Sequence, residues 1–414
     1  MRKSVAVLFG LVCMAYIAGC GDSSSTSTAT NYDVTTPVPA AAAPGTILGG
    51  SIQGGAPVFH DYSVSIFAGS SAGFNNISSA GSATFNRPIA VTTDGAYLYV
   101  ADYVNNAIRR INIATKHVMT IAGNSAGLAG STDGTGSAAS FNLPRDITTD
   151  GTSLYVADSG NYTIRKIDFP AGPEGTAVVT TIAGAVGVSG SLDSPNTGSN
   201  ARFNVLNGIT TDGKNLYVTD SNNTIRKIVL PSPGTVSSGP VTTVAGAPGT
   251  TGTADGLQSA ARFNLPSHIT TDGPNLYVTD FSSSTIRKIE LITGAVTTIA
   301  GKAEPGGAAG SHADSTDGTG QSARFNQPNG ITCDGSNLYV TDSYDNTIRK
   351  IVLSPGTVYS GPVTTIAGGA AGPAGGLTDG VGIAANFNFP IGITTDGTSL
   401  FITDSQNHRI RQIQ

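Results

Sequence analysis

The sequence predicts an all-β chain folded as a closed six-bladed β-propeller with four antiparallel strands in each blade. Three observations lead to this prediction. A unit of strand-forming sequence recurs six times, each copy contains an Asp-Gly turn between two strand-like runs, and a further strand-like run also recurs six times but is offset from the units at the two ends. The composition agrees, because 54 Gly, no Trp and 12% charged residues indicate many turns and short strands.

The second copy of the recurring unit is FNLPRDITTDGTSLYVADSGNYTIRKI, which begins at Phe141. It contains a β-branched run, an Asp-Gly turn, a Leu-Tyr-Val run, a polar turn and an alternating Thr-Ile-Arg-Lys-Ile run. The Asp of the Asp-Gly turn recurs every 56 to 62 residues, at Asp94, Asp150, Asp212, Asp272, Asp334 and Asp396. Such near-constant spacing is the signature of an array of equal structural units.

A fourth run, V-T-T-I-A-G or a close variant, completes each unit. Its copies end at Gly69, Gly123, Gly184, Gly246, Gly301 and Gly368. The first copy precedes the first unit, and no copy follows the last unit. We therefore expect residues 64–69 to complete the C-terminal blade, which closes the ring and leaves no incomplete blade edge. An open array would need capping units at both ends, and neither end supplies one.

The motifs P-x-G-I-T-x-D-G, L-Y-V-T-D-S-x-N and I-R-K-I together resemble the NHL repeat family. The last copy, DSQNHRIRQI, contains Asn407 and His408 with Ile410, which is similar to the tripeptide that names the family. The resemblance covers about residues 64–414 and implies the propeller fold. It implies no single activity, because that family includes protein-binding, RNA-binding and catalytic members.

The N-terminus resembles the signal of a bacterial lipoprotein. Arg2 and Lys3 precede an apolar stretch that ends in the segment IAGC at Cys20. The resemblance implies that residues 1–19 are a signal peptide cleaved before Cys20, whose thiol then carries a lipid. An ordinary signal peptide with an incidental cysteine is the alternative. Gly21 is not the Asp that signals retention in the inner membrane, so we expect a lipid-anchored protein of the cell envelope, in the outer membrane or at the cell surface.

Residues 20–60 are rich in Ser, Thr, Ala and Pro, and we interpret them as a flexible tether for a propeller that spans residues 61–414. The chain contains 22 Lys and Arg against 27 Asp and Glu, and loss of Arg2 and Lys3 with the signal would leave a net charge of about −7. This charge disfavours binding to nucleic acid. Cys333 would then be the single remaining thiol, so no intrachain disulfide is expected.

Residues that recur in all six units are predicted to be structural, because one active site does not need six copies. One such column ends the second strand, at Asp102, Asp158, Asp220, Asp280, Asp342 and Asp404. Another lies in the third strand, at Arg109, Arg165, Arg226, Arg287, Arg349 and Arg411. We expect the Asp side chains to bond to their own turns and the Arg side chains to pair with carboxylates. The acidic loops before each unit, such as STDGTGSAAS, contain too few carboxylates for a high-affinity calcium loop.

Positions that differ between the units are the expected location of a ligand site. Two adjacent columns vary at the start of the innermost strand: Ile89, Arg145, Asn207, Ser267, Asn329 and Ile391, then Ala90, Asp146, Gly208, His268, Gly330 and Gly392. The long loops that arrive from the preceding blade share this face, which should carry a deep rim around the central channel. The candidate ligand-binding residues of the channel mouth are Arg145, Asp146, Asn207, His268 and Asn329. The alternative is that they are solvated residues of the mouth, or that Asp146 pairs with Arg145 or a loop.

Two classes of function follow. The first is a monomeric, non-enzymatic scaffold that binds an envelope or extracellular protein or a polysaccharide, with no nucleic acid partner and with the lipid on Cys20 as its membrane contact. The Pro/Gly-rich insertions PAGPEG, PSPGTVSSGP and SPGTVYSGP offer a second surface, on the opposite face. The alternative is a metal-dependent hydrolase, lactonase or lyase with its site at the channel mouth, which is suggested by six-bladed propellers of those activities.

The residues of the mouth favour the scaffold over the enzyme. Asp146, Asn207 and Asn329 are candidate calcium ligands, but only one of them is a carboxylate, and calcium usually requires more. His268 is the one histidine of the inner columns, so a histidine-based zinc site lacks ligands. We therefore assign no catalytic residue and expect no resident cofactor, with calcium as the candidate if one is bound.

Overall fold

The computed structural model describes residues 46–48, 50–53, 61–76, 82–169, 172, 175–230, 238–303, 315–354, 360–369 and 375–414. The predicted signal peptide, Cys20 and the first half of the predicted tether lie outside these residues, as does most of each Pro/Gly-rich insertion. The described chain consists of β-strands and single-turn 3₁₀ helices. None of its helices is long and apolar enough to cross a membrane.

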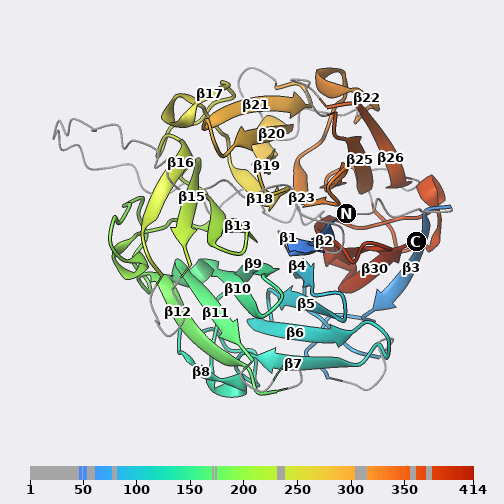
Figure 1. Ribbon diagram of the computed structural model, residues 1–414. Helices are drawn as coiled ribbons and strands as arrows, with labels where there is room; N and C mark the ends of the chain where they lie inside the picture. The colour runs from blue at the N-terminus through green and yellow to red at the C-terminus, as the bar shows by residue number, and fades with distance from the viewer. Residues whose placement is uncertain are drawn as a thin grey trace, which may run out of the picture. The chain divides into compact units, whose positions relative to one another are not determined.

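Six antiparallel sheets stand as blades around a central axis, which confirms the predicted six-bladed propeller (Figure 1). From the innermost strand outward, blade one contains β4 (Pro88–Thr93), β5 (Tyr97–Asp102), β6 (Ala107–Asn112) and β7 (Val118–Ala122). Blade two contains β9 (Pro144–Thr149), β10 (Ser153–Asp158), β11 (Thr163–Asp168) and β12 (Val178–Gly184). Blade three contains β13 (Leu206–Thr211), β14 (Asn215–Asp220), β15 (Thr224–Val229) and β16 (Val241–Gly246).

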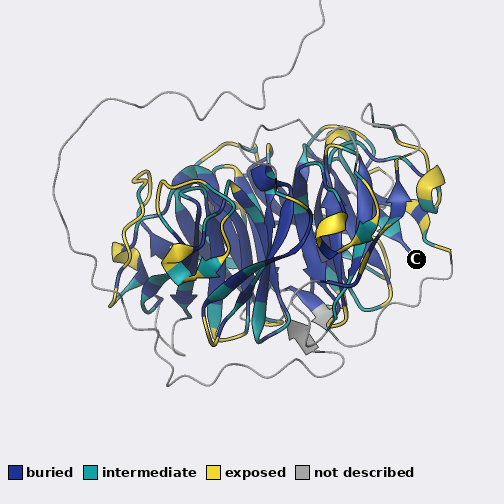
Figure 2. Cartoon of the chain, turned by 90° about the horizontal axis from the view of Figure 1, so that it is seen from above, coloured by how far each residue is buried: buried dark blue, intermediate teal, exposed yellow. Residues whose placement is uncertain are grey.

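The remaining blades repeat this order. Blade four contains β18 (Pro266–Thr271), β19 (Asn275–Asp280), β20 (Thr285–Glu290) and β21 (Ala295–Ala300). Blade five contains β23 (Pro328–Cys333), β24 (Asn337–Asp342), β25 (Thr347–Val352) and β26 (Pro362–Gly368). Blade six contains β28 (Pro390–Thr395), β29 (Leu400–Asp404), β30 (Arg409–Ile413) and β3 (Ser63–Ala68). Buried residues fill the strands, and exposed residues gather in the loops (Figure 2).

The ring is closed by the pairing of β3 with β30, as the offset of the repeats predicts. Val64 lies opposite Ile413 and Ile66 lies opposite Arg411 in an antiparallel register. The rings of Phe67 and Phe401 pack edge to face, with centroids 5.0 Å apart. The N-terminal strand therefore supplies the outer strand of the C-terminal blade.

The turn that connects each innermost strand to the second strand of its blade contains the Asp-Gly pair. In blade two, Asp150 Oδ1 accepts hydrogen bonds from the backbone amides of Thr152 and Ser153, both at 2.8 Å. Gly151 has a φ of +90°, a conformation that a residue with a side chain rarely adopts. Tyr155 Oη donates to Asp150 Oδ2 at 2.8 Å. The turn is therefore fixed by the Asp side chain and by the Gly backbone conformation, and both residues recur in every unit. We call the face that carries these turns the Asp-Gly face, and the opposite face, where the innermost strands begin, the channel-mouth face.

A fifth strand of two residues is present in four blades and was not predicted. These strands are β8 (Gly134–Thr135), β17 (Gly256–Leu257), β22 (Gly318–Thr319) and β27 (Gly380–Val381). Each belongs to a loop that arrives from the preceding blade and pairs with the outermost strand of its new blade. The loops predicted to build a deep rim around the channel therefore spend part of their length at the outer edge, where they cover open backbone groups.

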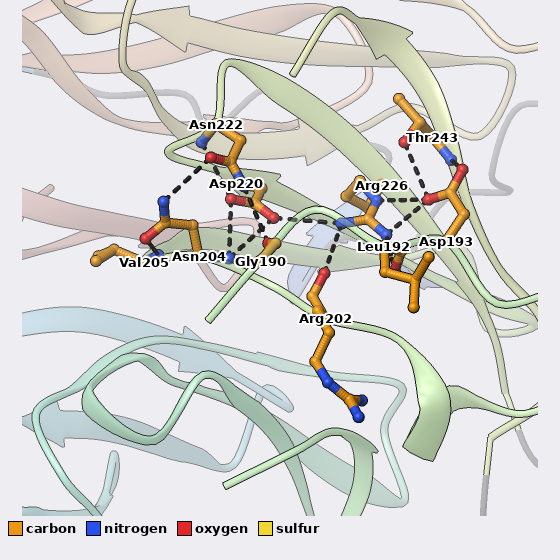
Figure 3. A network of polar contacts seen from close by, with 10 residues as sticks. All are labelled: Gly190, Leu192, Asp193, Arg202, Asn204, Val205, Asp220, Asn222, Arg226 and Thr243. Atoms are coloured by element: carbon orange, nitrogen blue, oxygen red, sulfur yellow. Dashed lines mark hydrogen bonds and ion pairs between the residues drawn. The ribbon is translucent and has the colours of Figure 1, made fainter. Parts of the chain in front are cut away.

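The recurring Asp and Arg side chains form a buried network, shown for blade three in Figure 3. Arg226 lies between Asp220, at 3.3 Å, and Asp193 of the arriving loop, at 2.6 Å. Asp193 also accepts a hydrogen bond from the Thr243 amide of the outermost strand, at 2.8 Å. The guanidinium stacks on Phe203, with Cζ 5.2 Å from the ring centroid. The network therefore ties the loop, the third strand and the outermost strand together.

The same arrangement recurs around the ring. The arginines with two carboxylate partners are Arg165, Arg226, Arg287, Arg349 and Arg411. Their loop partners are Asp133, Asp193, Asp255, Asp317 and Asp379. Four of these loop carboxylates, those of Asp133, Asp255, Asp317 and Asp379, belong to the acidic stretches with too few carboxylates for a calcium loop, and they bind arginine. The two columns assigned to architecture do have that role.

Candidate functional site

Four polar side chains form an arc at the channel mouth, where the innermost strands of blades two to five begin side by side. Arg145 Nη1 donates to Asn207 Oδ1 at 2.7 Å, and Asn207 Nδ2 donates to the Pro266 carbonyl at 2.9 Å. Ser267 Oγ donates to Asn329 Oδ1 at 2.6 Å. The structure therefore joins three of the predicted residues and Ser267 in two hydrogen-bonded groups, which meet at the adjacent residues Pro266 and Ser267. We call Arg145, Asn207, Ser267 and Asn329 the polar arc.

Asp146 lies one residue deeper than the arc and links two blades. Its Oδ1 accepts a hydrogen bond from the Ile147 amide at 2.8 Å, and its Oδ2 accepts one from the Ile209 amide of β13 at 2.7 Å. The side chain is 6% exposed, and this burial raises the pKa of Asp146 to about 7, although the two amides oppose the shift. The alternative pairing of Asp146 with Arg145 is replaced by these two backbone bonds.

In other blades a threonine hydroxyl links neighbouring innermost strands, and in blade two Asp146 makes this link instead. In blade five, the Gly330 amide donates to Thr341 Oγ1 at 2.7 Å, and that hydroxyl donates to the Ile391 carbonyl of blade six at 2.7 Å. Blade two has Ala157 at the threonine position and cannot form this bridge. The carboxylate of Asp146 connects the two neighbouring innermost strands instead.

His268 occupies the equivalent position in blade four and is 6% exposed. Burial, together with the charge of Arg145, lowers the pKa of His268 to about 3, so the imidazole is neutral at physiological pH. Asp146 and His268 line the same cavity of about 20 Å³, with Gly50 and Ser51 at its other side. A space of this size holds about one water molecule. The structure thus brings the two predicted residues to one small polar cavity, one level below the arc.

The candidate calcium ligands are already engaged as hydrogen-bond acceptors. Both oxygens of Asp146 accept backbone amides, Asn207 Oδ1 accepts Arg145, and Asn329 Oδ1 accepts Ser267. A guanidinium on Asn207 Oδ1 repels a cation at that oxygen. In the part of the chain that the structure describes, no group of three or more His, Cys, Asp or Glu side chains is placed to hold a metal ion. As arranged, these residues do not fit a calcium ion.

An aromatic row on the same face was not predicted from the sequence. The rings of Phe281 and Tyr344 meet edge to face with centroids 6.4 Å apart, and those of Tyr344 and Phe389 with centroids 5.3 Å apart. Tyr344 is 36% exposed, and the other two rings are partly buried. Phe281 and Tyr344 lie in the turns between second and third strands, and Phe389 immediately precedes β28. The row therefore spans blades four to six beside the channel mouth.

The sequence did contain a signal for this row, because its members break the sixfold pattern. Where blade four has Phe281, the sister blades have Tyr103, Ser159, Ser221, Ser343 and Ser405. Where blade six has Phe389, they have Arg87, Leu143, Val205, Leu265 and Gln327. The criterion that selected Asp146 and His268 applies equally to these columns, which lie just outside the innermost strand.

Relatives among curated proteins share the repeat. No family model matches the chain. NHL repeat-containing protein 2 of Bos taurus is 29% identical over 312 residues, which make up 68% of this chain and 40% of that protein. The Gallus gallus protein of the same name is 28% identical over 354 residues, or 79% of this chain and 46% of that protein. The chain is a six-bladed propeller whose sequence is similar to that of NHL repeat-containing proteins.

The chain spans less than half the length of these relatives. Among solved structures, a protein of unknown function from Bacteroides thetaiotaomicron aligns with a TM-score of 0.59 at 20% identity, covering 85% of this chain and 75% of that one. An auxiliary nutrient binding protein from the same organism aligns with a TM-score of 0.58 at 18% identity, covering 85% of this chain and 76% of that one. These likenesses show a shared fold.

Proposed function

We propose that this propeller is an exported, lipid-anchored binding scaffold that engages a protein or polysaccharide on its channel-mouth face. The observation that carries the proposal is the placement of the side chains that break the sixfold pattern. The polar arc and the aromatic row lie on this same face, at strand starts and in tight turns. The name of one structure of the same fold, an auxiliary nutrient binding protein, agrees with a binding role.

The two groups of residues supply complementary contacts. Half-buried aromatic rings offer a large apolar area at a low cost in side-chain entropy, and they dominate the energy of many interfaces. The polar arc adds a cation and amide groups whose positions are fixed by hydrogen bonds, so little ordering is needed on binding. The cavity below the arc has room for about one water molecule, about 20 Å³, so we expect the ligand to lie on the face and not inside the channel.

The binding proposal is tested by capture from envelope extracts with the purified propeller. Tyr344→Ala and Arg145→Ala should each reduce the captured material about tenfold, which corresponds to about 1.4 kcal/mol. Lys214→Ala is the matched control, because Lys214 is exposed on the Asp-Gly face. Equal capture by all three variants would place the binding surface elsewhere. Treatment of the captured material with protease or with glycosidase separates a protein ligand from a polysaccharide.

The proposal of export and lipid anchoring depends on the IAGC segment alone. Mass spectrometry of the mature N-terminus should find a diacylglyceryl group on Cys20 and no residue before it. Cys20→Ser should release the protein from the membrane fraction. An unmodified chain that begins at another residue would refute the anchor and leave the binding proposal untouched.

A further inference from the structure

A ring of six threonines lines the channel between the cavity and the Asp-Gly face. Its members occupy the fifth position of each innermost strand: Thr92, Thr148, Thr210, Thr270, Thr332 and Thr394. All six are 0 to 1% exposed. They share one register, since each lies opposite the aromatic residue of the adjacent second strand. The repeat therefore places six hydroxyls at one level, which we call the threonine ring.

Half of the threonine ring holds the tip of an N-terminal hairpin. Within the range predicted to be tether, β1 (Thr46–Leu48) and β2 (Ser51–Gln53) pair with each other at the centre of the ring of blades (Figure 1). The Gly50 carbonyl accepts hydrogen bonds from Thr92 Oγ1 at 2.7 Å and from Thr394 Oγ1 at 3.0 Å. Ser51 Oγ bonds to Thr332 Oγ1 at 2.5 Å and to Thr394 Oγ1 at 3.0 Å.

The fit of this tip depends on glycine. Gly50 has a φ of +74°, and a Cβ atom there would lie 2.8 Å from Thr148 Oγ1 and closer still to Thr92 Oγ1. The Thr93 amide adds a third donor to the Gly50 carbonyl, at 3.2 Å. Ser51 is 1% exposed. The site is therefore shaped for a tight turn that presents a carbonyl oxygen and a hydroxyl.

The other three threonines of the ring do not bond to the part of the hairpin that the structure describes. The hydroxyls of Thr148, Thr210 and Thr270 are buried and have no hydrogen-bond partner among the described residues. A buried hydroxyl without a partner costs about 1–3 kcal/mol, so these three hydroxyls have unused hydrogen-bonding capacity for a bound turn. Strand β2 contacts the innermost strands of blades one, five and six, which carry the small residues Ala90, Gly330 and Gly392 two positions before the threonine, whereas Asp146 and His268 belong to blades two and four.

We propose that the threonine ring is a binding site for a peptide β-turn, that Gly50 and Ser51 fill it in cis, and that the hairpin of β1 and β2 is a displaceable plug of the channel. A two-stranded hairpin with three-residue strands is at best marginally stable in water, so it keeps its shape only while docked. Its tip is held by neutral hydrogen bonds, each worth about 0.5–1.5 kcal/mol. The proposal is independent of binding on the channel-mouth face, because the plug enters from the opposite side.

The plug is tested in the full chain with two glycine variants. Gly50→Ala places a methyl group against the ring, whereas Gly213→Ala is the matched control: Gly213 has a similar φ of +83° but open space around it. Hydrogen exchange of the Thr93 amide, which donates to Gly50, should become at least about tenfold faster in Gly50→Ala and stay unchanged in Gly213→Ala. Unchanged exchange in Gly50→Ala would show that the hairpin does not occupy the ring.

Binding in trans tests the ring as a site for a turn. A synthetic peptide of residues 46–53 should bind Gly50→Ala with one-to-one stoichiometry and bind the parent chain at least about tenfold more weakly, because the parent ring is filled. Adding Thr394→Val should abolish binding, whereas adding Thr270→Val, which removes a hydroxyl that the turn does not use, should preserve it. Failure of the peptide to bind Gly50→Ala, or equal effects of the two valine substitutions, would overturn the proposal.

Discussion

Asp146 and His268 are buried in the channel, and burial acts on them in opposite directions. The pKa of Asp146 is raised to about 7 and that of His268 is lowered to about 3, in both cases because the interior disfavours the charged form. A carboxyl group whose pKa is raised on folding stabilises the fold when the pH is below the pKa that the group has in the unfolded chain. This stabilisation is lost as the pH rises through the pKa of the folded state. An imidazole whose pKa is lowered on folding stabilises the fold when the pH is above the pKa that the group has in the unfolded chain. This stabilisation is lost as the pH falls through the pKa of the folded state.

These shifts predict two variants with opposite pH dependence. Relative to the parent, the unfolding free energy of Asp146→Asn should rise between about pH 4 and pH 7, with a slope of up to about 1.4 kcal/mol per pH unit. That of His268→Gln should fall relative to the parent as pH rises from about 3 to 6.5. Urea denaturation at a series of pH values measures both. Comparison with the parent at each pH removes the contribution of other buried carboxylates, whose pKa values are also raised, to about 6 at Asp158 and Asp280. Parallel curves for both variants would show that neither group titrates in this range.

At the residue scale, the sequence predicted which side chains are architectural but not how the exceptions are used. Sixfold recurrence identified the Asp and Arg columns, because a residue that every blade needs must appear in every blade. Asp146 was found because it replaces Gly. Its bonds to the Ile147 and Ile209 amides depend on the distance between neighbouring innermost strands and on Ala157 in the adjacent strand. No pattern within one unit contains that information.

Within each blade, the buried arginine is the element that joins strands to the arriving loop. Removing one partner of a buried ion pair leaves an uncompensated charge and costs about 3–5 kcal/mol. Arg226 is fully buried, and its two carboxylate partners come from β14 and from the loop that precedes blade three. Loss of this side chain should therefore weaken the blade more than loss of a surface charge.

Arg226→Leu should lower the free energy of unfolding by about 3–5 kcal/mol, because Asp220 and Asp193 lose their common partner. Lys227→Leu is the matched control, since Lys227 is the next residue of β15 and is partly exposed, and it should change stability by less than about 0.5 kcal/mol. Adding Asp220→Asn to Arg226→Leu should restore part of the loss by removing the unpaired charge. Equal stability of the two single variants, measured by urea denaturation, would contradict a structural role for the network.

The elements that the sequence missed are short. A two-residue strand such as β8 shows no alternation, and it forms because the outermost strand of the blade offers open backbone groups. The hairpin at residues 46–53 did have a signal, since TILGGSIQ contains two short strand-like runs around a Gly-Gly pair. The Ser/Thr/Ala/Pro composition of its surroundings indicated a tether instead. Its docking depends on threonine hydroxyls from blades one, five and six, which only the closed fold brings together.

For the whole molecule, closure of the ring by β3 determines whether blade six is complete. Val64 and Phe67 are 2% and 3% exposed; Phe67 packs between the first and last blades, and Val64 packs between blades five and six. Without β3, the edge of β30 would be unpaired and these contacts would be lost. The same strand is the reason that the two ends of the ring of blades meet in one sheet.

Two truncations isolate this contribution, because both lack the hairpin and differ only in β3. A chain that begins at Tyr62 keeps β3, and a chain that begins at Ser70 does not. Burial of a large apolar side chain is worth about 1.5–3 kcal/mol, so losing Val64, Ile66 and Phe67 should lower the melting temperature by on the order of 10 °C, as followed by circular dichroism. The shorter chain should also aggregate, since the exposed edge of β30 is free to pair with another molecule. A melting temperature equal to that of the longer chain would mean that the ring is held by contacts between blades and not by the shared sheet. The offset of the repeats predicted that β3 completes blade six, so the difference in melting temperature between the two truncations also tests that prediction.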